Sequence, residues 1–326
     1  MLGALALDRI AGDLRASRAL AGKRDIAVVA ARLSLSADSV VPVGDDCAAI
    51  PDGDGYLLFA IEGFMNEFVE RDPWFAGWCG VMVNLSDVAA MGGRPIGVVD
   101  AIWAAGDAAA MPLLDGIRAA AETYNVPIVG GHTNTRTDRS QLSVAIVGRA
   151  KHLLTSFDAK PAERLIAAID LRGRYREPFA NWEAATDAPP ARLKGDLEVL
   201  PSLAEADLAV AAKDISQGGV VGTTMMLAEC SRVGAVIDVA RLPKPPGTPL
   251  ERWLVTFPSY GFVMAARPQN VEAIIGQFAV RGIAAAEIGE FTNDHRVTIS
   301  DGTASEVIWD FTREPLLGCA SAEASA

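Results

Sequence analysis

The order of β-prone and helical segments constrains this chain more than any other feature of its sequence. In the first half, β-prone apolar runs alternate with segments of helical periodicity, and glycine or proline residues separate them. The predicted strands are residues 43–50, 56–61, 96–103, 126–129 (short and buried) and 141–149, and the predicted helices lie within 3–35, 73–91 and 111–124. This order predicts an α+β half of about 150 residues.

The second half repeats the combination of strands and helices. Its predicted strands are residues 208–212, 235–239, 260–265 and 297–299, and its predicted helices are 220–232 and 270–281. Between these halves, after residue 150, the periodicity loosens, and we expect an irregular crossing segment there. We therefore predict an α/β (α+β) chain with one domain at residues 1–150 and a second at 151–326.

The charge balance limits the class of partner. Twenty-nine Lys and Arg against forty-one Asp and Glu residues give a net charge of −12, which disfavours nucleic acid and anionic membranes as partners. A polyphosphate ligand remains compatible, because metal ions can supply positive charge. The four cysteines have no close pair, and Asp8 and Arg9 interrupt the apolar N-terminus. These features argue against a zinc site, a disulfide framework and a signal peptide, so we expect a cytoplasmic location.

Two adjacent carboxylates follow a glycine in the segment Val43–Ile50. Neighbouring residues of a strand point to opposite faces, so Asp45 and Asp46 could serve one site only if the backbone bends at Gly44. Carboxylate oxygens suit a hard cation such as Mg²⁺. A solvated turn is the alternative explanation of the pair.

Two further segments place polar side chains near the ends of predicted elements. Gly53 and Gly55 favour a hairpin between the first two predicted strands, which would bring Glu62 within reach of the acidic pair. Asn84 and Asp87 are three residues apart and therefore share one face of the helix predicted at 73–91. Water binding or a capping role explains these two residues as well as ligand binding does.

Glycine-rich turns supply two more candidate sites. His132 lies in the predicted loop Gly130–Thr133, where a lone histidine is either a structural hydrogen-bonding group or a chemically active one. Asp214–Gly219 joins a predicted strand to a predicted helix, and backbone N–H groups at such a helix start bind anions. The alternative is that Ser216 simply caps the helix.

Together, the order and spacing of these motifs resemble the ATP-binding superfamily of aminoimidazole ribonucleotide (AIR) synthase, which includes thiamine-monophosphate kinase and formylglycinamidine synthase. The matching segments are Val43–Ile50, Asn84–Gly92, Gly130–Thr133 and Asp214–Gly219. The resemblance is strongest to the kinase branch. It implies a PurM-like two-domain fold, with an N-terminal α/β domain that dimerises and a C-terminal α/β domain, and an ATP site at the junction of domains and subunits.

The resemblance also implies roles for individual residues. The implied Mg²⁺ ligands are Asp45, Asp46, Asp87 and Asp214, with Glu62 as a further candidate. The implied nucleotide-binding residues are Gly44, Asn84, Gly130, Gly131, Ser216 and Gly218. Asp45, Asp46 and His132 are the candidate catalytic residues. Metal ions that neutralise charge and align the displacement leave little covalent chemistry for side chains in phosphoryl transfer.

Three positions depart from the kinase branch. Phe59–Phe64 lacks an aspartate and a histidine of that branch, Phe257–Phe262 lacks two acids, and Gln217 stands where aspartate is usual. The expected function is therefore that of an Mg²⁺-ATP-dependent phosphotransferase or synthetase acting on an unidentified small metabolite, as a homodimer. Thiamine-monophosphate kinase and a non-catalytic nucleotide-binding subunit are the alternatives.

Overall fold

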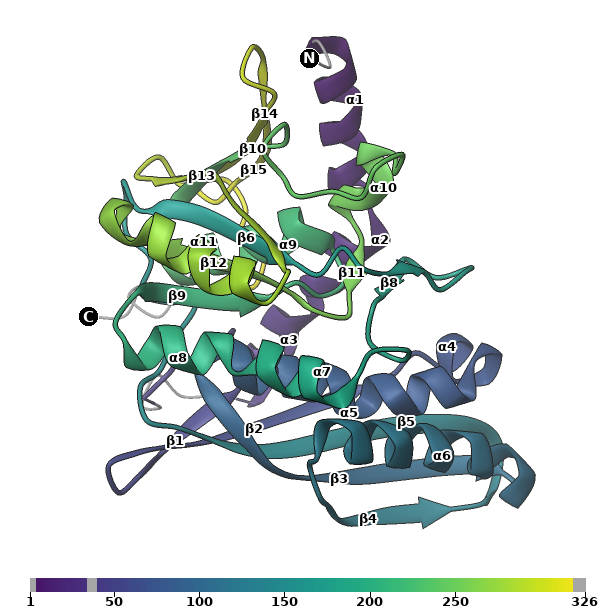
Figure 1. Ribbon diagram of the computed structural model, residues 1–326. Coiled ribbons are helices and arrows are strands. Elements are labelled where there is room, and N and C mark those ends of the chain that lie inside the picture. The colour runs from purple at the N-terminus through teal and green to yellow at the C-terminus, as the bar shows by residue number, and fades with distance from the viewer. Residues whose placement is uncertain (1–3, 34–39, 319–326) are drawn as a thin grey trace. The chain divides into compact units, whose positions relative to one another are not determined.

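The computed structural model describes residues 4–33 and 40–318, and contacts between residues divide the chain into two compact units (Figure 1). The five-stranded unit comprises residues 46–153 and 186–202. The seven-stranded unit comprises the chain up to Asp45, residues 154–185 and the chain from Leu203 onward. The segment before Asp46 thus packs with the later part of the sequence. The linear domains 1–150 and 151–326 stay a prediction.

The five-stranded unit is built on a mixed sheet with the strand order β1-β2-β5-β3-β4 in the described chain. Strands β3 and β4 are parallel, and the other neighbours are antiparallel. The strands are β1 (Ala48–Asp52), β2 (Gly55–Gly63), β3 (Gly93–Ala105), β4 (Ile128–Asn134) and β5 (Arg136–Ala150). Its helices include α4 (Asn66–Arg71), α5 (Pro73–Ala90), α6 (Asp107–Tyr124) and α7 (Pro190–Leu197). The predicted hairpin is confirmed, since β1 pairs with β2 across the turn at Gly53, but its first strand begins at Ala48 instead of residue 43.

Helix α5 is the central helix of this unit, and the helix predicted at residues 73–91 is confirmed. Pro73 occupies its first turn, and the carboxylate of Asp72 caps it by accepting a hydrogen bond of 3.3 Å from the Phe75 backbone N–H. Gly92, with φ of 76°, ends it. Every residue from Phe75 to Ala90 is buried, because α5 packs against α6 and against β2, β3 and β5.

Glycines set the distance between α5 and α6. A Cβ atom on Gly77 would lie 2.1 Å from the Leu113 carbonyl oxygen, and one on Gly116 would lie 1.9 Å from the Trp74 carbonyl oxygen. Each helix therefore presents a glycine to the backbone of the other, and no larger residue fits there at the present spacing. This close packing fixes the position of α5 in its unit.

The face of the sheet that α5 and α6 leave uncovered is apolar. Along β2 the side chains alternate, with Leu58 and Ala60 buried and Phe59 and Ile61 47% and 65% exposed. Strand pairing places further exposed apolar residues on the same face. We define the exposed sheet face by Ile50, Phe59, Ile61 and Val99.

The predictions for residues 126–133 were wrong in two respects. A buried strand was expected at 126–129, followed by a glycine loop, but β4 begins at Ile128, includes Gly130–Thr133 and is exposed along its whole length. Strand β4 lies at the edge of the sheet, where it pairs in parallel with β3. Apolar residues at an edge need not be buried, and glycines there are compatible with a strand.

The seven-stranded unit contains, in the described chain, a mixed sheet with the order β15-β14-β10-β13-β6-β12-β9 and a small sheet with the order β11-β8-β7. The first sheet consists of β6 (Arg164–Ile169), β9 (Ala209–Asp214), β10 (Gly234–Asp238), β12 (Gly261–Ala266), β13 (Ala284–Thr292), β14 (Arg296–Ser300) and β15 (Ser305–Asp310). The small sheet consists of β7 (Arg174–Tyr175), β8 (Asn181–Glu183) and β11 (Phe257–Pro258). The helices α9 (Gly219–Cys230), α10 (Leu250–Leu254) and α11 (Val271–Val280) belong to this unit, and α8 (Val199–Glu205) leads into it.

Strand β6 contradicts the expectation of an irregular crossing segment after residue 150. It lies between β12 and β13 and is buried on both faces. Leu165, Ala167 and Ile169 belong to the hydrophobic core that includes α9, and Ile166 and Ala168 point to the opposite face. A strand covered on both faces has no alternation of polar and apolar residues, and alanine has weak strand propensity, so the sequence pattern did not reveal it.

The helical region predicted at residues 3–35 contains three helices within the described residues 4–33, and its remaining positions lie outside the described residues. These helices are α1 (Ala4–Arg15), α2 (Arg18–Lys23) and α3 (Asp25–Leu33). No helix in the described part of the chain combines the length and the apolar run needed to cross a bilayer. Cys47, Cys79 and Cys230 are buried, and none of these three forms a disulfide bond in the described chain.

Candidate functional site

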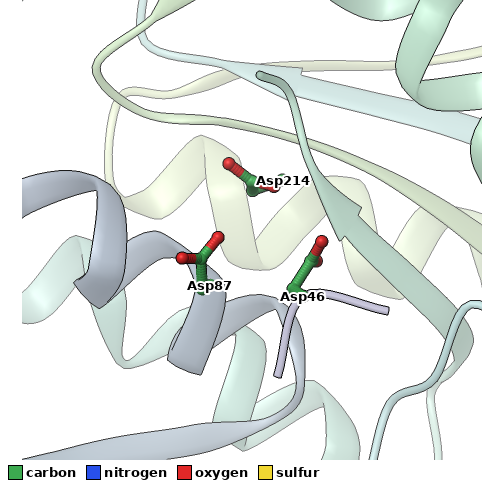
Figure 2. Close-up of side chains that lie close together, drawn as sticks. All are labelled: Asp46, Asp87 and Asp214. Atoms are coloured by element: carbon green, nitrogen blue, oxygen red, sulfur yellow. The ribbon is translucent and has the colours of Figure 1, made fainter. Parts of the chain in front are cut away.

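Two predicted metal ligands come together inside the five-stranded unit. Asp46 precedes β1, Asp87 lies in the last turns of α5, and carboxylate oxygens of the two lie within 4.8 Å of each other (Figure 2). Asp87 is 4% exposed, and Asp46 is partly buried. Two ionised carboxylates at this separation, one of them buried, repel each other unless a cation or a proton lies between them. Oxygen ligands at this separation could hold a hard divalent cation.

Asn84 fixes the helix that carries Asp87. Its side chain is fully buried, and its Nδ2 donates hydrogen bonds to the Gly80 carbonyl oxygen at 2.8 Å and to the Val144 carbonyl oxygen at 3.0 Å. The second bond ties α5 to β5, one helical turn before Asp87. The amide nitrogen of Asn84 thus has a structural role, and its contact with phosphate stays a prediction.

The hairpin formed by β1 and β2 positions Glu62 near the end of β2, opposite Val144 of β5. Glu62 is partly exposed. Within the described ranges, it does not join Asp46 and Asp87 in a group of acids whose oxygens all lie within 4.8 Å. Its role as a metal ligand stays a prediction.

The glycines and the histidine of the predicted loop lie on β4 instead. Gly131 pairs with Asp100 of β3, and a Cβ atom on Gly131 would lie 2.8 Å from Asp100 Oδ2, so a larger residue there would require the Asp100 carboxylate to move. Burial raises the pKa of the Asp100 carboxyl. The His132 ring is exposed and lies 5.9 Å from the Trp103 ring. Asp100 was not among the predicted site residues, although a single charge in an apolar strand marks its position in the sequence.

Asp214 and the glycine-rich turn belong to the seven-stranded unit. Asp214, which is also drawn in Figure 2, is the last residue of β9 and is 4% exposed. Gly218 and Gly219 have φ angles of 103° and 61°, and Gly218 is the N-cap of α9. A Cβ atom on Gly219 would lie 2.2 Å from the Leu254 carbonyl oxygen, so this turn requires glycine.

Ser216 does not cap helix α9, which was one of the two roles considered for it. The idea that it caps the helix was wrong, because α9 begins at Gly219 and its N-cap residue is Gly218, which has no side chain to form a capping bond. Ser216 Oγ instead accepts a hydrogen bond of 3.2 Å from Lys23 Nζ of α2. The binding of nucleotide by Ser216 and Gly218 stays a prediction.

Asp45 also belongs to the seven-stranded unit, unlike its neighbour Asp46. Its Oδ2 accepts a hydrogen bond of 2.8 Å from the Ser156 backbone N–H, and its Oδ1 accepts one of 2.7 Å from Ser156 Oγ. Lys213 Nζ lies 3.9 Å from the same Oδ1. Sequence reasoning singled out neither partner. For Lys213 a signal existed, namely a charged residue near the end of an apolar strand.

The chain belongs to the AIR synthase-related family. The family's N-terminal domain, described as "AIR synthase related protein, N-terminal domain", matches residues 44–150. Its C-terminal domain, described in the same way, matches residues 180–302. These two matches contain the acidic pair near their start, both polar residues of α5, the glycines of β4 and the turn before α9.

The chain is similar to proteins of bacteria and archaea. It is 46% identical over 280 residues to an uncharacterized protein of Synechocystis sp., covering 85% of this chain and 87% of that protein. It is 37% identical over 286 residues to an uncharacterized protein of Methanocaldococcus jannaschii, covering 86% and 88%. It is 26% identical over 298 residues to the thiamine-monophosphate kinase of Synechococcus elongatus, covering 81% and 88%.

Solved structures share the fold. The AaThiL structure in complex with AMPPCP and TMP has a TM-score of 0.66 and 19% identity, covering 85% of this chain and 92% of that chain. T. maritima PurL in complex with ADP has a TM-score of 0.72 and 18% identity, covering 86% of this chain and 47% of that chain. The predicted PurM-like architecture, with mixed α/β sheets and helices, is therefore confirmed.

Proposed function

We propose that this protein is an Mg²⁺-ATP-dependent phosphotransferase or synthetase that acts on a small metabolite. The observation that carries the proposal is the approach of Asp46 and Asp87 within one unit, with their oxygens within 4.8 Å of each other. Similarity to a thiamine-monophosphate kinase and to structures solved with AMPPCP and ADP adds support. The acidic chain, with its net charge of −12, suits a polyphosphate ligand only if cations accompany it.

The donor set agrees with this proposal. Asp46 and Asp87 offer only carboxylate oxygens, which favour Mg²⁺ over softer metals. We propose that Asp214, at the end of β9, supplies a third carboxylate and that the Gly218–Gly219 turn before α9 binds phosphate through its backbone N–H groups. Bound Mg²⁺ would neutralise the phosphate charge that develops during transfer. The chain's own residues would hold the cation and orient the nucleotide.

A crystallographic experiment tests the metal ligands directly. Crystals grown with AMPPCP and Mn²⁺, which substitutes for Mg²⁺ and scatters anomalously, are expected to show an anomalous peak within bonding distance of Asp46 and Asp87. Bound nucleotide with its metal held by other residues would contradict these assignments.

Thiamine-monophosphate kinase is a second candidate, because relatives of that name match the chain at 26% identity or more over most of its length. The segment Phe257–Phe262 argues against it. Where the kinase branch has two acids, Tyr260 is buried and packs edge-on against Phe262 at 5.0 Å. The hydroxyl of Ser259 accepts a hydrogen bond from the Ala184 backbone N–H. In this segment, packed side chains therefore occupy the positions where the kinase branch has acidic residues.

We predict that thiamine monophosphate is not phosphorylated by this protein. In a coupled assay of ADP formation, addition of thiamine monophosphate is expected to leave the rate at the level measured with ATP alone. The reason is the loss of the acids described above, since a site that lacks charged partners binds a cationic substrate weakly. A rate of ADP formation that depends on thiamine monophosphate, with thiamine diphosphate identified as the product, would establish the second candidate instead. A screen of other small metabolites in the same assay would then search for the acceptor.

We also propose that the protein is a homodimer that pairs through the exposed sheet face. That face carries a row of apolar side chains along neighbouring strands, and Ile61 alone is 65% exposed. Contiguous exposed apolar surface of this kind is typical of an interface, and a two-fold axis brings the same patch together from both subunits.

The substitution of Phe59 and Ile61 by Asp is expected to produce a monomer, since burying four carboxylates in an apolar two-fold interface is strongly unfavourable. Sedimentation velocity would measure the change. The control is Val280→Asp, at the end of α11, where the native side chain is 86% exposed outside this face. A wild type that sediments as a monomer, or a double variant that remains dimeric, would contradict this interface.

A further inference from the structure

The carboxylate of Asp45 is already engaged within the seven-stranded unit. Both of its oxygens accept hydrogen bonds from Ser156, at 2.8 Å from the backbone N–H and 2.7 Å from Oγ. Its side chain is 1% exposed, and that of Lys213, 3.9 Å away, is 5% exposed. A buried carboxylate bound by two donors and facing a buried ammonium group is in a stable arrangement, because each charge offsets the desolvation of the other.

Ser156, which binds Asp45, is itself bound by the C-terminal end of α9. Ser231, the C-cap residue of α9, donates a hydrogen bond of 2.7 Å from its Oγ to the Ser156 carbonyl oxygen and accepts one of 3.0 Å from the Ala159 backbone N–H. Beside it, the thiol of Cys230 contacts the Gly44 carbonyl oxygen at 3.7 Å. The C-terminal end of α9 therefore holds the Gly44–Asp45 segment in place, through Cys230 directly and through Ser231 and Ser156.

The two charged partners have related positions along the chain. Asp45 directly precedes Asp46, and Lys213 directly precedes Asp214. Neighbouring residues in a strand point to opposite faces, so Lys213 directs its ammonium group, and with it Asp45, to the face of β9 opposite Asp214. The contact between Asp45 and Lys213 therefore joins two chain segments. The residues that follow them, Asp46 and Asp214, are the proposed metal ligands.

We propose that the two neighbouring aspartates have different roles, so that Asp46 is a metal ligand whereas Asp45 is a positioning residue. Asp45, Ser156 and Lys213 hold the backbone from which the Asp46 carboxylate projects. This inference rests on the proposed Mg²⁺-ATP site and revises the implied role of Asp45 as a ligand. Coordination of a metal by Asp45 would compete with its two hydrogen bonds from Ser156 and with the charge of the buried Lys213 for the same carboxylate.

The first experiment compares the affinity for Mn²⁺ in the presence of AMPPCP, measured by electron paramagnetic resonance on the full-length protein. Asp45→Asn and Ser156→Ala are each expected to weaken binding about 10-fold, the magnitude typical of residues that orient metal ligands. Because both changes act on the contact between Asp45 and Ser156, the double variant should lose less affinity than the product of the two single effects, whereas independent sites would multiply their effects. Ser156→Thr, which restores the hydroxyl, should recover the affinity. Ser305→Ala, at the exposed start of β15, is the control.

A second measurement separates this inference from the proposed function. Hydrogen exchange, followed by mass spectrometry without metal or nucleotide, is expected to become faster in a peptide covering residues 43–48 in both Asp45→Asn and Ser156→Ala. If the wild type binds neither Mn²⁺ nor AMPPCP, the proposed function fails, and the exchange result still decides whether Asp45 anchors this segment. Unchanged exchange in both variants would overturn the inference. So would an Asp45→Asn variant that loses as much Mn²⁺ affinity as Asp46→Asn while Ser156→Ala binds like the wild type.

Discussion

Replacing Asp46 or Asp87 by Asn is expected to weaken Mg²⁺-dependent binding of AMPPCP at least about 100-fold, or about 2.7 kcal/mol. Each substitution removes one of two carboxylates whose oxygens lie within 4.8 Å of each other. Asn keeps the shape of the side chain but takes away the charge that a hard cation requires. The double variant should bind the nucleotide no better with Mg²⁺ than without it.

The matched control for this prediction is Asp54→Asn. Asp54 lies in the turn between β1 and β2, is 80% exposed and pairs with Arg149 at 2.7 Å. Its substitution makes the same charge change in the same unit, and nucleotide affinity is expected to stay unchanged. Isothermal titration compares the wild type with the three site variants and the control, and the circular dichroism spectra of all five proteins should be identical. Wild-type affinity in the Asp46 and Asp87 variants would show that the acids serve no metal.

Replacing Gly116 by Ala is expected to destabilise the five-stranded unit by about 3 kcal/mol or more, at the upper end of the cost of overpacking. The added methyl group would lie 1.9 Å from the Trp74 carbonyl oxygen and 2.9 Å from the Trp78 backbone nitrogen. Both atoms belong to the backbone of α5, so relief requires the two helices to move apart. Since α5 carries Asp87, nucleotide binding should weaken as well.

Chemical denaturation followed by tryptophan fluorescence would measure this loss of stability. The control is Gly276→Ala, in the middle of the exposed face of α11, where an added Cβ atom meets no atom within 4 Å. That substitution is expected to stabilise the protein by about 0.5–1 kcal/mol, because alanine loses less conformational entropy in a helix than glycine does. A Gly116→Ala variant as stable as the wild type would mean that α5 and α6 pack less closely than described.

Much of the fold could be predicted from local signals in the sequence. Pro73 and Gly92 bracket α5, and the glycines of the β1–β2 turn identify the hairpin, because these residues restrict the backbone wherever they occur. Strand β6 could not be predicted in this way, since its burial depends on layers contributed by distant parts of the chain. The exposure of β4 likewise depends on its place at the sheet edge, which the sequence pattern does not encode.

In the candidate site, too, features set by residues close in sequence could be predicted, and features set by distant residues could not. The spacing of Asn84 and Asp87 predicts that they share a helix face, and the resemblance to a family identifies the acids by their order. The different placement of Asp45 and Asp46 could not be predicted, because it depends on Ser156, which is 111 residues away in sequence from Asp45. Contacts over such separations leave no periodic pattern near either residue.

The most direct test of the central claim is an isothermal titration of the wild-type protein with AMPPCP, with and without Mg²⁺. The proposal predicts binding of one nucleotide per chain in the presence of Mg²⁺ and a large loss of affinity when EDTA replaces the metal. Absence of binding under both conditions, or an affinity that does not depend on Mg²⁺, would contradict an Mg²⁺-ATP site built on Asp46 and Asp87.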